Sequence, residues 1–522
     1  MKLQWLYRES EESFIDQILT NRNRTKVDYQ KKLQDLPDDM LLKDFDIGIE
    51  RILHAMYNNE RIVIFGHDDP DGVTATYLLY DFFENCGFQN HYYYIPNRLV
   101  DHHGIQDNLV DYIKMKQANL LITVDNGISS KEKVEEIKAL GIDVIITDHH
   151  LFDQENLPLA TAVINPKRQD CDYPYDMIAG VGVSLLVVRG LAKKLNKEVS
   201  PAYYFWTAVG SLADRVPMYD VNWVIVRHVL DYWDDMKDNT INMLKSVCSP
   251  IVNNFDKINF LNYSYRMIAN GRDNHGIHHG LKFMLANDKE KYDEFSLIQT
   301  EKKTNEQNLF GLNTIISEIL ADYDGRGVVY FDEEGRIPSH LLGTCATFLV
   351  NSLYEPVIML KERDDIVICE GRCSDGFSII EAFKYCEEVL IQFGGHVKAA
   401  GFTMHKENMQ RFIELYQEYF QQQKQQIDDN KTINIDAVID ISELDDDLIG
   451  QLDFMLPFGQ DNQEPMLLVK NFDLASKHHH LLLDNNIKTK LAHDKLYELI
   501  VQINNSGQAK VIDYRESYEH NN

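Results

Sequence analysis

The sequence from Arg61 to Leu79, RIVIFGHDDPDGVTATYLL, predicts the main architecture of this chain. Its residues 62–65 are β-branched or aromatic, which is typical of a buried strand in a parallel sheet. Gly66 ends this strand, and a helical pattern begins near Gly72. A buried strand that leads directly into a helix predicts an α/β domain, in which ligands bind just beyond the carboxyl ends of the strands.

Four ionisable side chains crowd into that position. His67, Asp68, Asp69 and Asp71 lie within five residues of one another. Such a group is mutually repulsive unless a cation joins it, and oxygen ligands with one nitrogen suit Mn²⁺ or Mg²⁺ better than a thiolate metal. The alternative interpretation is a solvated loop in which Asp71 caps the following helix.

Strands and helices continue to alternate after this stretch, which predicts a parallel βαβ sheet. Further strands are expected at 91–95, 120–124 and 144–147, with helices through residue 83 and at 107–116 and 130–139. Residues 287–322 show one long helical pattern with a thin apolar stripe, which is typical of a helix that bridges two domains. A second α/β region follows and ends in a polar linker, QQQKQQIDDNK.

Composition limits the class of protein. The chain has 522 residues, 44% of them hydrophobic, which is enough for several domains with their own cores. Its net charge of −30 argues against nucleic-acid binding through a generally basic surface, but leaves a local groove or a metal-lined site open. Seven cysteines form no paired C-x-x-C framework, and the Cys369–Cys373 spacing stands alone, so reduced core thiols in a cytoplasmic protein are expected. No apolar segment suggests a signal peptide or a membrane span.

Three more acidic or histidine clusters follow the first. Asp125 comes at the tip of the third expected strand, and Asp148-His149-His150 follows the fourth. Asp214 lies in an otherwise small and apolar run. Because the carboxyl ends of parallel strands meet at one edge of a sheet, we expect these clusters to converge.

Each cluster also has an ordinary interpretation. Asp125 could cap the next helix, and His149–His150 could be surface histidines. Asp214 could be an acid paired with Arg215 or Arg227. The convergence on one crevice favours a shared metal site over three unrelated explanations.

Two divalent ions about 4 Å apart, held by shared carboxylates, would activate a water and stabilise the leaving oxygen of a phosphodiester. The sequence contains no G-x-S-x-G elbow, no P-loop lysine motif and no G-x-G-x-x-G. Acyl transfer, NTP-driven chemistry and dinucleotide binding therefore lack support.

Taken together, the motifs resemble the DHH phosphoesterase superfamily and, within it, the RecJ family of single-strand-specific 5′→3′ DNA exonucleases. The motifs that carry the resemblance are LPDDM (36–40), HDDPDG (67–72), IPNR (95–98), TVDNGISS (123–130), TDHH (147–150), VINPKR (163–168), AGVGVS (179–184), GSLADRVPM (210–218), NGR (270–272), FGGHVKAAGF (393–402) and LPFGQDNQEP (456–465).

The resemblance implies five regions of the chain. They are a helical N-terminal lead-in (1–60), a DHH catalytic domain with a helical subdomain (61–285), a connecting helix (286–325), a nucleic-acid-binding α/β domain of the DHHA1 type (326–427) and a C-terminal OB-like β-barrel (428–522). It also implies two bound ions, Mn²⁺ or Mg²⁺.

The resemblance further implies which residues form the site. The metal ligands would be His67, Asp69, Asp71, Asp125, His149 and Asp214. His150 would stabilise charge at the scissile phosphate, and Asp148 would orient the histidines. The nucleic-acid-binding residues would be Asn270, Arg272, Arg372, Gly394, Gly395 and His396.

The chain departs from the RecJ pattern at two positions. His67 stands where these exonucleases usually have an aspartate, although other branches of the superfamily have histidine there. Glu370 stands where a serine precedes the arginine that matches Arg372, and an acid there would repel a 5′-phosphate. The sequence therefore leaves the preference for phosphorylated 5′ ends open.

These observations predict a metal-dependent 5′→3′ exonuclease that hydrolyses single-stranded DNA to mononucleotides in DNA repair and recombination. One alternative is a phosphodiesterase of short oligonucleotides or cyclic dinucleotides from the same superfamily, which His67 favours. Another is a non-catalytic scaffold in replication or repair. The resemblance implies single-stranded DNA, a helicase and a single-strand-binding protein as partners, and we expect a cytoplasmic monomer. DNA and RNA present the same phosphates, so the sequence leaves that choice open.

Overall fold

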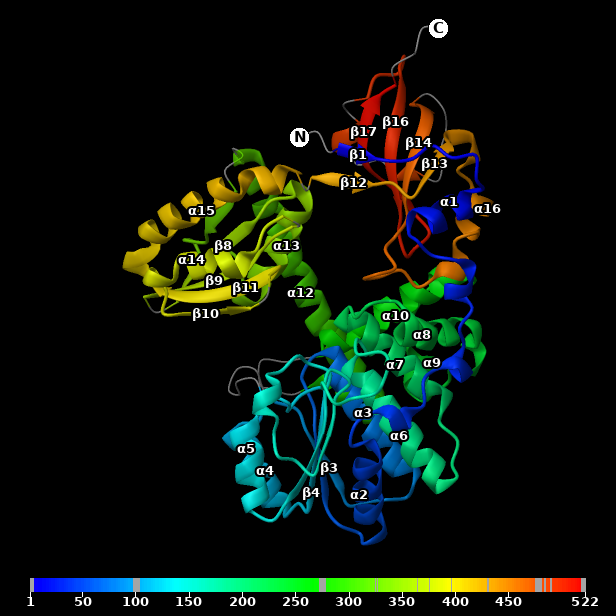
Figure 1. Cartoon of the computed structure of the whole chain (residues 1–522), viewed down its shortest axis with the longest axis vertical. Helices are drawn as coiled ribbons and strands as arrows, with labels where there is room; N and C mark the ends of the chain where they lie inside the picture. The colour runs from blue at the N-terminus through cyan, green and yellow to red at the C-terminus, as the bar shows by residue number, and fades with distance from the viewer. Residues whose placement is uncertain are drawn as a thin grey trace. The chain divides into compact units, whose positions relative to one another are not determined.

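The computed structural model of the chain describes residues 4–96, 104–271, 278–323, 325, 327–363, 365–374, 376–395, 397–429, 431–474, 481–482, 485–488 and 491–517. The chain divides into two compact units (Figure 1). The larger unit comprises Arg8–Lys302 and Ile435–Asn522, and the smaller one comprises Met1–Tyr7 and Lys303–Asn434.

The larger unit contains a five-stranded parallel sheet, as the sequence predicts. Its strand order is β3 (His91–Tyr94), β2 (Ile62–Phe65), β4 (Leu120–Val124), β5 (Asp143–Thr147) and β6 (Ala162–Ile164). Helices cover both faces: α4 (Asp107–Lys116) and α5 (Lys131–Ala139) on one, and α2 (Phe45–Tyr57), α3 (Pro70–Asn85) and α6 (Gly180–Leu195) on the other (Figure 1). Successive residues of β2 enter opposite cores, since Ile62 and Ile64 belong to one hydrophobic cluster and Val63 and Phe65 to another.

A helical region and a second sheet complete the larger unit. The helices are α1 (Phe14–Asn21), α7 (Pro201–Asp214), α8 (Asp220–Asp231), α9 (Asn239–Ser246), α10 (Asn254–Ala269) and α11 (His279–Leu285). The second sheet has the order β13 (Ala437–Asp440), β14 (Met466–Asp473), β16 (Leu496–Ile503), β17 (Ala509–Glu516) and β15 (Leu481–Leu482), and α16 (Asp446–Gly450) precedes β14. Its apolar side chains join the same core as those of α7, since Leu467 and Phe205 belong to one buried cluster.

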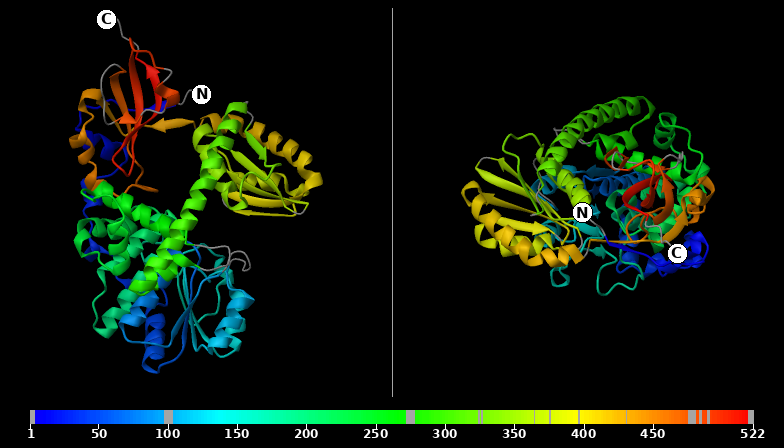
Figure 2. Two further views of the ribbon diagram at one scale, coloured as in Figure 1. Left: turned by 180° about the vertical axis from the view of Figure 1, so that it is seen from behind. Right: turned by 90° about the horizontal axis from the view of Figure 1, so that it is seen from above.

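The smaller unit is a second α/β layer structure. The long helix α12 (Asp288–Asp322) leads into it and is drawn as one unbroken helix in Figure 2. Its sheet has the order β10 (Gln392–Gly395), β11 (Ala399–His405), β9 (Ile366–Arg372), β8 (Val357–Arg363) and β7 (Val328–Phe331). One core lies between this sheet and α13 (Leu342–Leu353), and another between it and α14 (Ile379–Tyr385) and α15 (Met409–Asp429).

The N-terminal residues contain a strand that the expected helical lead-in lacks. The short strand β1 (Gln4–Leu6) pairs in parallel with β12 (Thr432–Asn434), and both belong to the smaller unit. Three residues are too few to show an alternating pattern, so the sequence gives no signal for this strand.

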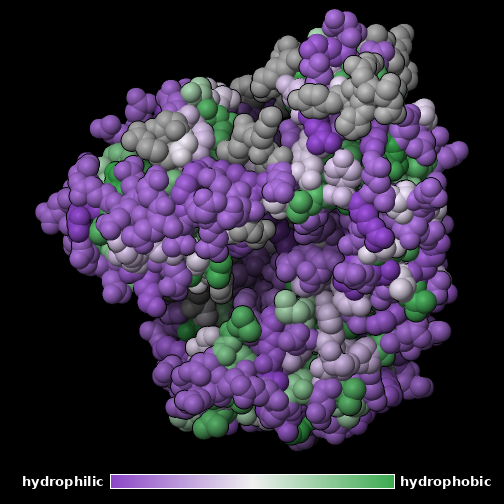
Figure 3. Space-filling model, turned by 45° about the horizontal axis from the view of Figure 1, so that its top comes forward, coloured by the Kyte–Doolittle hydropathy of each residue, from purple (hydrophilic) through white to green (hydrophobic). Residues whose placement is uncertain are grey.

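The visible surface is mainly hydrophilic, as the large net charge requires (Figure 3). Within the described part of the chain, no helix combines the length and the apolar character needed to cross a membrane. All seven cysteines carry free thiols, and four of them, Cys345, Cys369, Cys373 and Cys386, are buried.

Candidate metal centre

The candidate site lies at the carboxyl ends of three adjacent strands. β2, β4 and β5 are neighbours in the sheet, and each is followed at once by one of the clusters that the sequence singles out. The residues after these strands are His67–Asp71, Asp125 and Asp148–His150. The predicted convergence at one edge of the sheet is therefore present.

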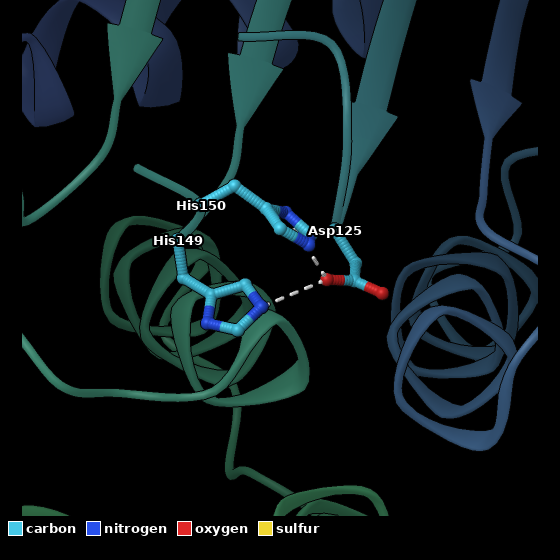
Figure 4. A group of neighbouring side chains, drawn as sticks. All are labelled: Asp125, His149 and His150. Carbon is cyan, nitrogen blue, oxygen red and sulfur yellow. Dashed lines mark ion pairs between the residues drawn. The ribbon is translucent and has the colours of Figure 1, made fainter. Parts of the chain in front are cut away.

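Asp125 is the central residue of this cluster. Both imidazoles of the 148–150 turn point toward its carboxylate (Figure 4). His149 Nε2 lies 3.1 Å from Asp125 Oδ1, and His150 Nδ1 lies 4.0 Å from the same oxygen. Asp125 Oδ1 and His149 Nε2 are buried, yet neither has a hydrogen-bond partner among the described residues. Buried polar atoms are rarely left in this state, so the pair is suited to share a cation.

Two further groups of side chains extend the cluster on either side of Asp125. His67 Nδ1 lies 2.8 Å from Asp69 Oδ2 and 3.8 Å from Asp125 Oδ2. On the other side, His149 Nε2 lies 3.7 Å from both Asp71 Oδ2 and Asp214 Oδ2. Each group offers three ligand atoms within 4.8 Å of one another. All six residues predicted as metal ligands are therefore brought together.

The backbone fixes Asp125 in an unusual conformation. Its φ is +58°, in the left-handed region that non-glycine residues seldom adopt. Gly180, the first residue of α6, lies so close that a Cβ there would be 2.5 Å from Asp125 Oδ1. The absence of a side chain at Gly180 is thus a condition for the position of the carboxylate. Strain of this kind is common at functional sites.

The start of α6 also holds Asp71. Its two carboxylate oxygens accept hydrogen bonds from the backbone N–H groups of Gly180, at 2.8 Å, and Val181, at 2.7 Å. A carboxylate is favoured there because the unpaired N–H groups at a helix start carry partial positive charge. α6 thereby ties the first motif to the Asp125 carboxylate.

The ordinary interpretations of these residues differ from what the structure shows. Asp69, not Asp71, caps α3, since its side chain accepts from Gly72 N at 3.0 Å. The N-cap of α5 is Ser130 rather than Asp125. Arg227 pairs with Asp231 and Asp453, at 2.8 and 3.4 Å, instead of Asp214.

When no metal is bound, burial and mutual repulsion raise the pKa values of three carboxyl groups of the cluster above their usual range. Burial, followed by the charge of Asp214, raises the pKa of Asp71 to about 7. Burial and the nearby Asp69 raise the pKa of Asp214 to about 6, and burial with Asp71 raises the pKa of Asp125 well above its usual value. Burial lowers the pKa of His149, which favours the neutral imidazole that binds metals. A divalent cation would relieve this repulsion.

Asp148 holds the turn that carries both histidines. Its Oδ1 accepts from the N–H groups of His149 and His150 and lies 2.7 Å from His150 Nδ1, while its Oδ2 accepts from Ile128 N. Burial alone would raise the pKa of Asp148, but its hydrogen bonds, that of His150 first, bring it below the usual value. The same hydrogen bond raises the pKa of His150, whose side chain is 53% exposed.

The residues predicted to bind nucleic acid are distributed over both units. Asn270 follows α10 and donates to Arg266 O at 2.7 Å. In the smaller unit, Gly394 and Gly395 lie on the exposed strand β10, and Arg372 Nη1 donates to Glu370 Oε2 at 2.9 Å. Arg272 and His396 lie outside the described residues. The acid that replaces the family's serine is therefore an ion-pair partner of the neighbouring arginine.

Two residues beside the cluster belong to the VINPKR motif, for which the sequence suggests no individual roles. Asn165 Nδ2 donates to His150 O at 3.1 Å, and Lys167 Nζ donates to His149 O at 2.5 Å. Neither contact can be read from the sequence, because it depends on how the chain turns after β6.

Comparison with known proteins agrees with this architecture. Residues 61–210 match the model of the DHH family, N-terminal domain, and residues 435–506 match that of the RecJ OB domain. The single-stranded-DNA-specific exonuclease RecJ of Bacillus subtilis is 27% identical over 443 residues, which are 84% of this chain but only 55% of that protein. The protein of the same name from Escherichia coli is 27% identical over 415 residues, covering 71% of this chain and 70% of its own length.

A solved structure, that of RecJ from Thermus thermophilus in complex with Mn²⁺, shares the fold. It superposes with a TM-score of 0.76 at 20% sequence identity and covers 96% of this chain and 76% of that chain. The α/β architecture with a parallel sheet, a long helix, a second α/β layer and a C-terminal OB domain is thus the one that the sequence predicts.

Proposed function

We propose that this chain, whose residues 61–210 match the DHH family, N-terminal domain, and whose residues 435–506 match the RecJ OB domain, is a metal-dependent exonuclease that hydrolyses single-stranded DNA in the 5′→3′ direction. The observation that carries the proposal is the buried pair Asp125 Oδ1 and His149 Nε2, which lie 3.1 Å apart and have no hydrogen-bond partner in the described chain. The single-stranded-DNA-specific exonucleases among its relatives give the substrate class.

The donor set fits two hard divalent cations, Mn²⁺ or Mg²⁺. His67, Asp69 and Asp125 would hold one ion, and Asp71, His149 and Asp214 the other, with Asp125 between them. When bound, such ions lower the pKa of a water and stabilise the oxygen that leaves the phosphorus. A solved structure of a RecJ protein with Mn²⁺ and another with Mg²⁺ support this choice of metals.

The remaining chemistry is assigned to the 148–150 turn. The carboxylate of Asp148 accepts a hydrogen bond from His150 Nδ1, which fixes the ring and keeps it protonated at higher pH. Because the His150 side chain is half exposed, a phosphate can approach it and receive a hydrogen bond as negative charge develops. His150 thus contacts the substrate, and Asp148 positions it.

The other regions are assigned to strand binding. We infer that region 326–427, with Gly394, Gly395 and Arg372, and the OB domain hold the single strand beyond the cut. Partnership with a helicase and a single-strand-binding protein, a monomeric state and a cytoplasmic location belong to the same proposal. The seven free thiols support the proposed cytoplasmic location, because the cytoplasm is a reducing compartment in which thiols stay unpaired.

A second candidate function is cleavage of short oligonucleotides only. Its support is His67, an imidazole at a position where RecJ proteins usually have a carboxylate, 2.8 Å from Asp69 and therefore part of the cluster. An imidazole in place of a carboxylate lowers the negative charge of the site, which changes its metal preference.

One experiment distinguishes the two functions. A long single strand labelled at either end is incubated with the protein in Mn²⁺ and in Mg²⁺, and products are resolved by length. The proposal expects labelled mononucleotide from the 5′ end from the first time points. Asp125→Asn, which keeps the shape of the side chain, should lower the rate at least about 100-fold, as loss of a centrally placed electrostatic group does in other enzymes.

The control is Asp111→Asn, which removes an exposed carboxylate from α4 and should leave the rate unchanged. Cleavage of di- to pentanucleotides alone would favour the short-oligonucleotide enzyme. A wild-type protein that cleaves neither substrate in either metal would contradict both functions.

A further inference from the structure

Two side chains of the segment that follows β6 donate hydrogen bonds to the turn that carries the histidines. Asn165, which is fully buried, donates through Nδ2 to His150 O and accepts through Oδ1 from Lys167 N at 2.8 Å. Lys167 then donates through Nζ to His149 O at 2.5 Å. The two side chains thus hold the carbonyl groups of both histidines that adjoin Asp125.

Lys167 brings a positive charge to this contact. A neutral amide, such as that of Asn165, would be enough to pair with the His149 carbonyl. The charge of Lys167 acts on both Asp214 and His149. Partial burial lowers the pKa of its ammonium group, and Asp176, Asp214 and Asp148 act in the opposite direction.

The Lys167 side chain remains accessible. It is only partly buried, and with Arg168 and Asp176 it lines a pocket of about 470 Å³ whose lining residues all lie in the 166–176 segment and none in the metal cluster. The guanidinium of the neighbouring Arg168 already forms two ion pairs, with Asp44 at 2.6 Å and with Asp170 at 2.8 Å. Of these two adjacent cations, Lys167 is therefore the one whose charge is available to bind the anionic group of a ligand.

Charge balance shows why such a cation is useful. The site contains six carboxylates, those of Asp68, Asp69, Asp71, Asp125, Asp148 and Asp214, and one of them, Asp148, is paired with the His150 imidazole. Two divalent ions and a protonated His150 would bring five positive charges, so the loaded site would stay negative by one charge. A phosphodiester is itself an anion, and one more cation at the edge of the site removes the repulsion.

We propose that Lys167 is a substrate-binding residue whose ammonium group, anchored on the His149 carbonyl, donates a hydrogen bond to a non-bridging oxygen of a DNA backbone phosphate next to the metal centre. This inference rests on the proposed function and deepens it. A lysine suits the task because a point charge can contact a phosphate without regard to base sequence.

Three variants separate charge from anchoring. Lys167→Arg keeps the charge, Lys167→Gln keeps a donor for the His149 carbonyl without the charge, and Lys167→Met removes both. The matched control is Lys138→Met, since Lys138 Nζ also donates to a backbone carbonyl, that of Leu159, on the α5 side of the sheet.

The first readout is equilibrium binding of a fluorescent, phosphorothioate-linked oligothymidylate in Mn²⁺, followed by anisotropy over a range of salt concentrations. Lys167→Gln and Lys167→Met should each weaken binding about tenfold and reduce the slope of log K against log salt by about 0.7, the value for one phosphate contact on a single strand. Lys167→Arg and Lys138→Met should bind as the wild type does.

The second readout is Mn²⁺ binding by calorimetry without DNA. Removing a positive charge beside the carboxylates should leave this affinity equal to or tighter than that of the wild type. Weaker Mn²⁺ binding in Lys167→Gln, or unchanged oligonucleotide binding in Lys167→Met, would overturn the proposal and make Lys167 a structural clamp alone. Neither readout requires hydrolysis, so an inactive wild type would contradict the exonuclease function without affecting this test.

Discussion

Asp125 cannot be moved without cost, because its backbone is strained and Gly180 packs against its carboxylate. In Gly180→Ala, the new methyl group would lie 2.5 Å from Asp125 Oδ1 and 2.6 Å from its Cβ. One of the two residues must shift, and a displacement of about 1 Å in an active site can cost about 100-fold in rate. We therefore expect Gly180→Ala to retain its fold, by circular dichroism, and to lose about 100-fold of its hydrolysis rate.

Gly311→Ala in α12 is the comparison for this variant, since a Cβ there meets no atom of the described residues within 4 Å, the backbone of the helix itself aside. It should keep full activity and be slightly more stable, because alanine favours a helix over glycine by about 1 kcal/mol. Full activity in Gly180→Ala would show that the position of Asp125 is less restricted than its geometry implies.

The sequence predicts which side chains converge at the sheet edge better than it predicts the contacts that support them. His67, Asp125 and His149 can be found because each closely follows a strand with a clear pattern, and adjacent parallel strands end at one edge. Lys167 and Gly180 cannot, since their contacts depend on where the segment after β6 and the start of α6 meet the strand ends. A glycine or lysine at such a position carries no signal of what it contacts.

The elements of the smaller unit are joined by one buried acid. Glu355, 1% exposed, accepts from Lys424 Nζ at 2.7 Å and Lys431 Nζ at 2.6 Å, and also from the hydroxyl of Tyr323. These partners come from α15, from the residue before β12 and from the residue after α12. Glu355 therefore ties three elements that are distant in the sequence.

Glu355→Gln should destabilise this unit by roughly 3 kcal/mol, because two ammonium groups would lose their charged partner in a poorly solvated place. Denaturant unfolding of the full chain, with a probe in the smaller unit, measures the effect. Glu414→Gln, which removes an exposed partner of Arg411 on α15, should change stability by less than about 0.5 kcal/mol. Equal stability of the two variants would mean that the buried group makes no net contribution.

Long or strongly patterned elements are the ones that the sequence predicts correctly. β2 is found to the residue because it is a continuous apolar run, and α12 differs by one residue at its start because its apolar stripe has helical spacing. The three-residue strands β1 and β6 are not predicted, because their place in a sheet is decided by the neighbour that pairs with them. The edge strand β6 matters most, since the segment after it carries Lys167.

The acidic cluster links the stability of the folded chain to pH and to metal. A carboxyl group whose pKa is raised by folding stabilises the folded state below its ordinary pKa and loses that contribution as pH rises through the folded value. Asp71, with a pKa of about 7, and Asp214, with a pKa of about 6, are such groups, and Asp125 is shifted in the same direction. Without metal, the larger unit should thus lose stability between about pH 4 and pH 7.

Bound metal should reverse this trend, because it binds the deprotonated carboxylates and protons compete with it. Mn²⁺ at 100 times its dissociation constant at pH 8 should add about 2.7 kcal/mol of stability, and the same concentration at about pH 5.5 should add clearly less. Thermal unfolding of the full chain at both pH values, with and without Mn²⁺, measures the difference. Asp214→Asn, which removes one carboxyl group with a raised pKa, should make the stabilisation by Mn²⁺ depend less on pH. An equal effect of Mn²⁺ at both pH values would show that these acids do not bind it.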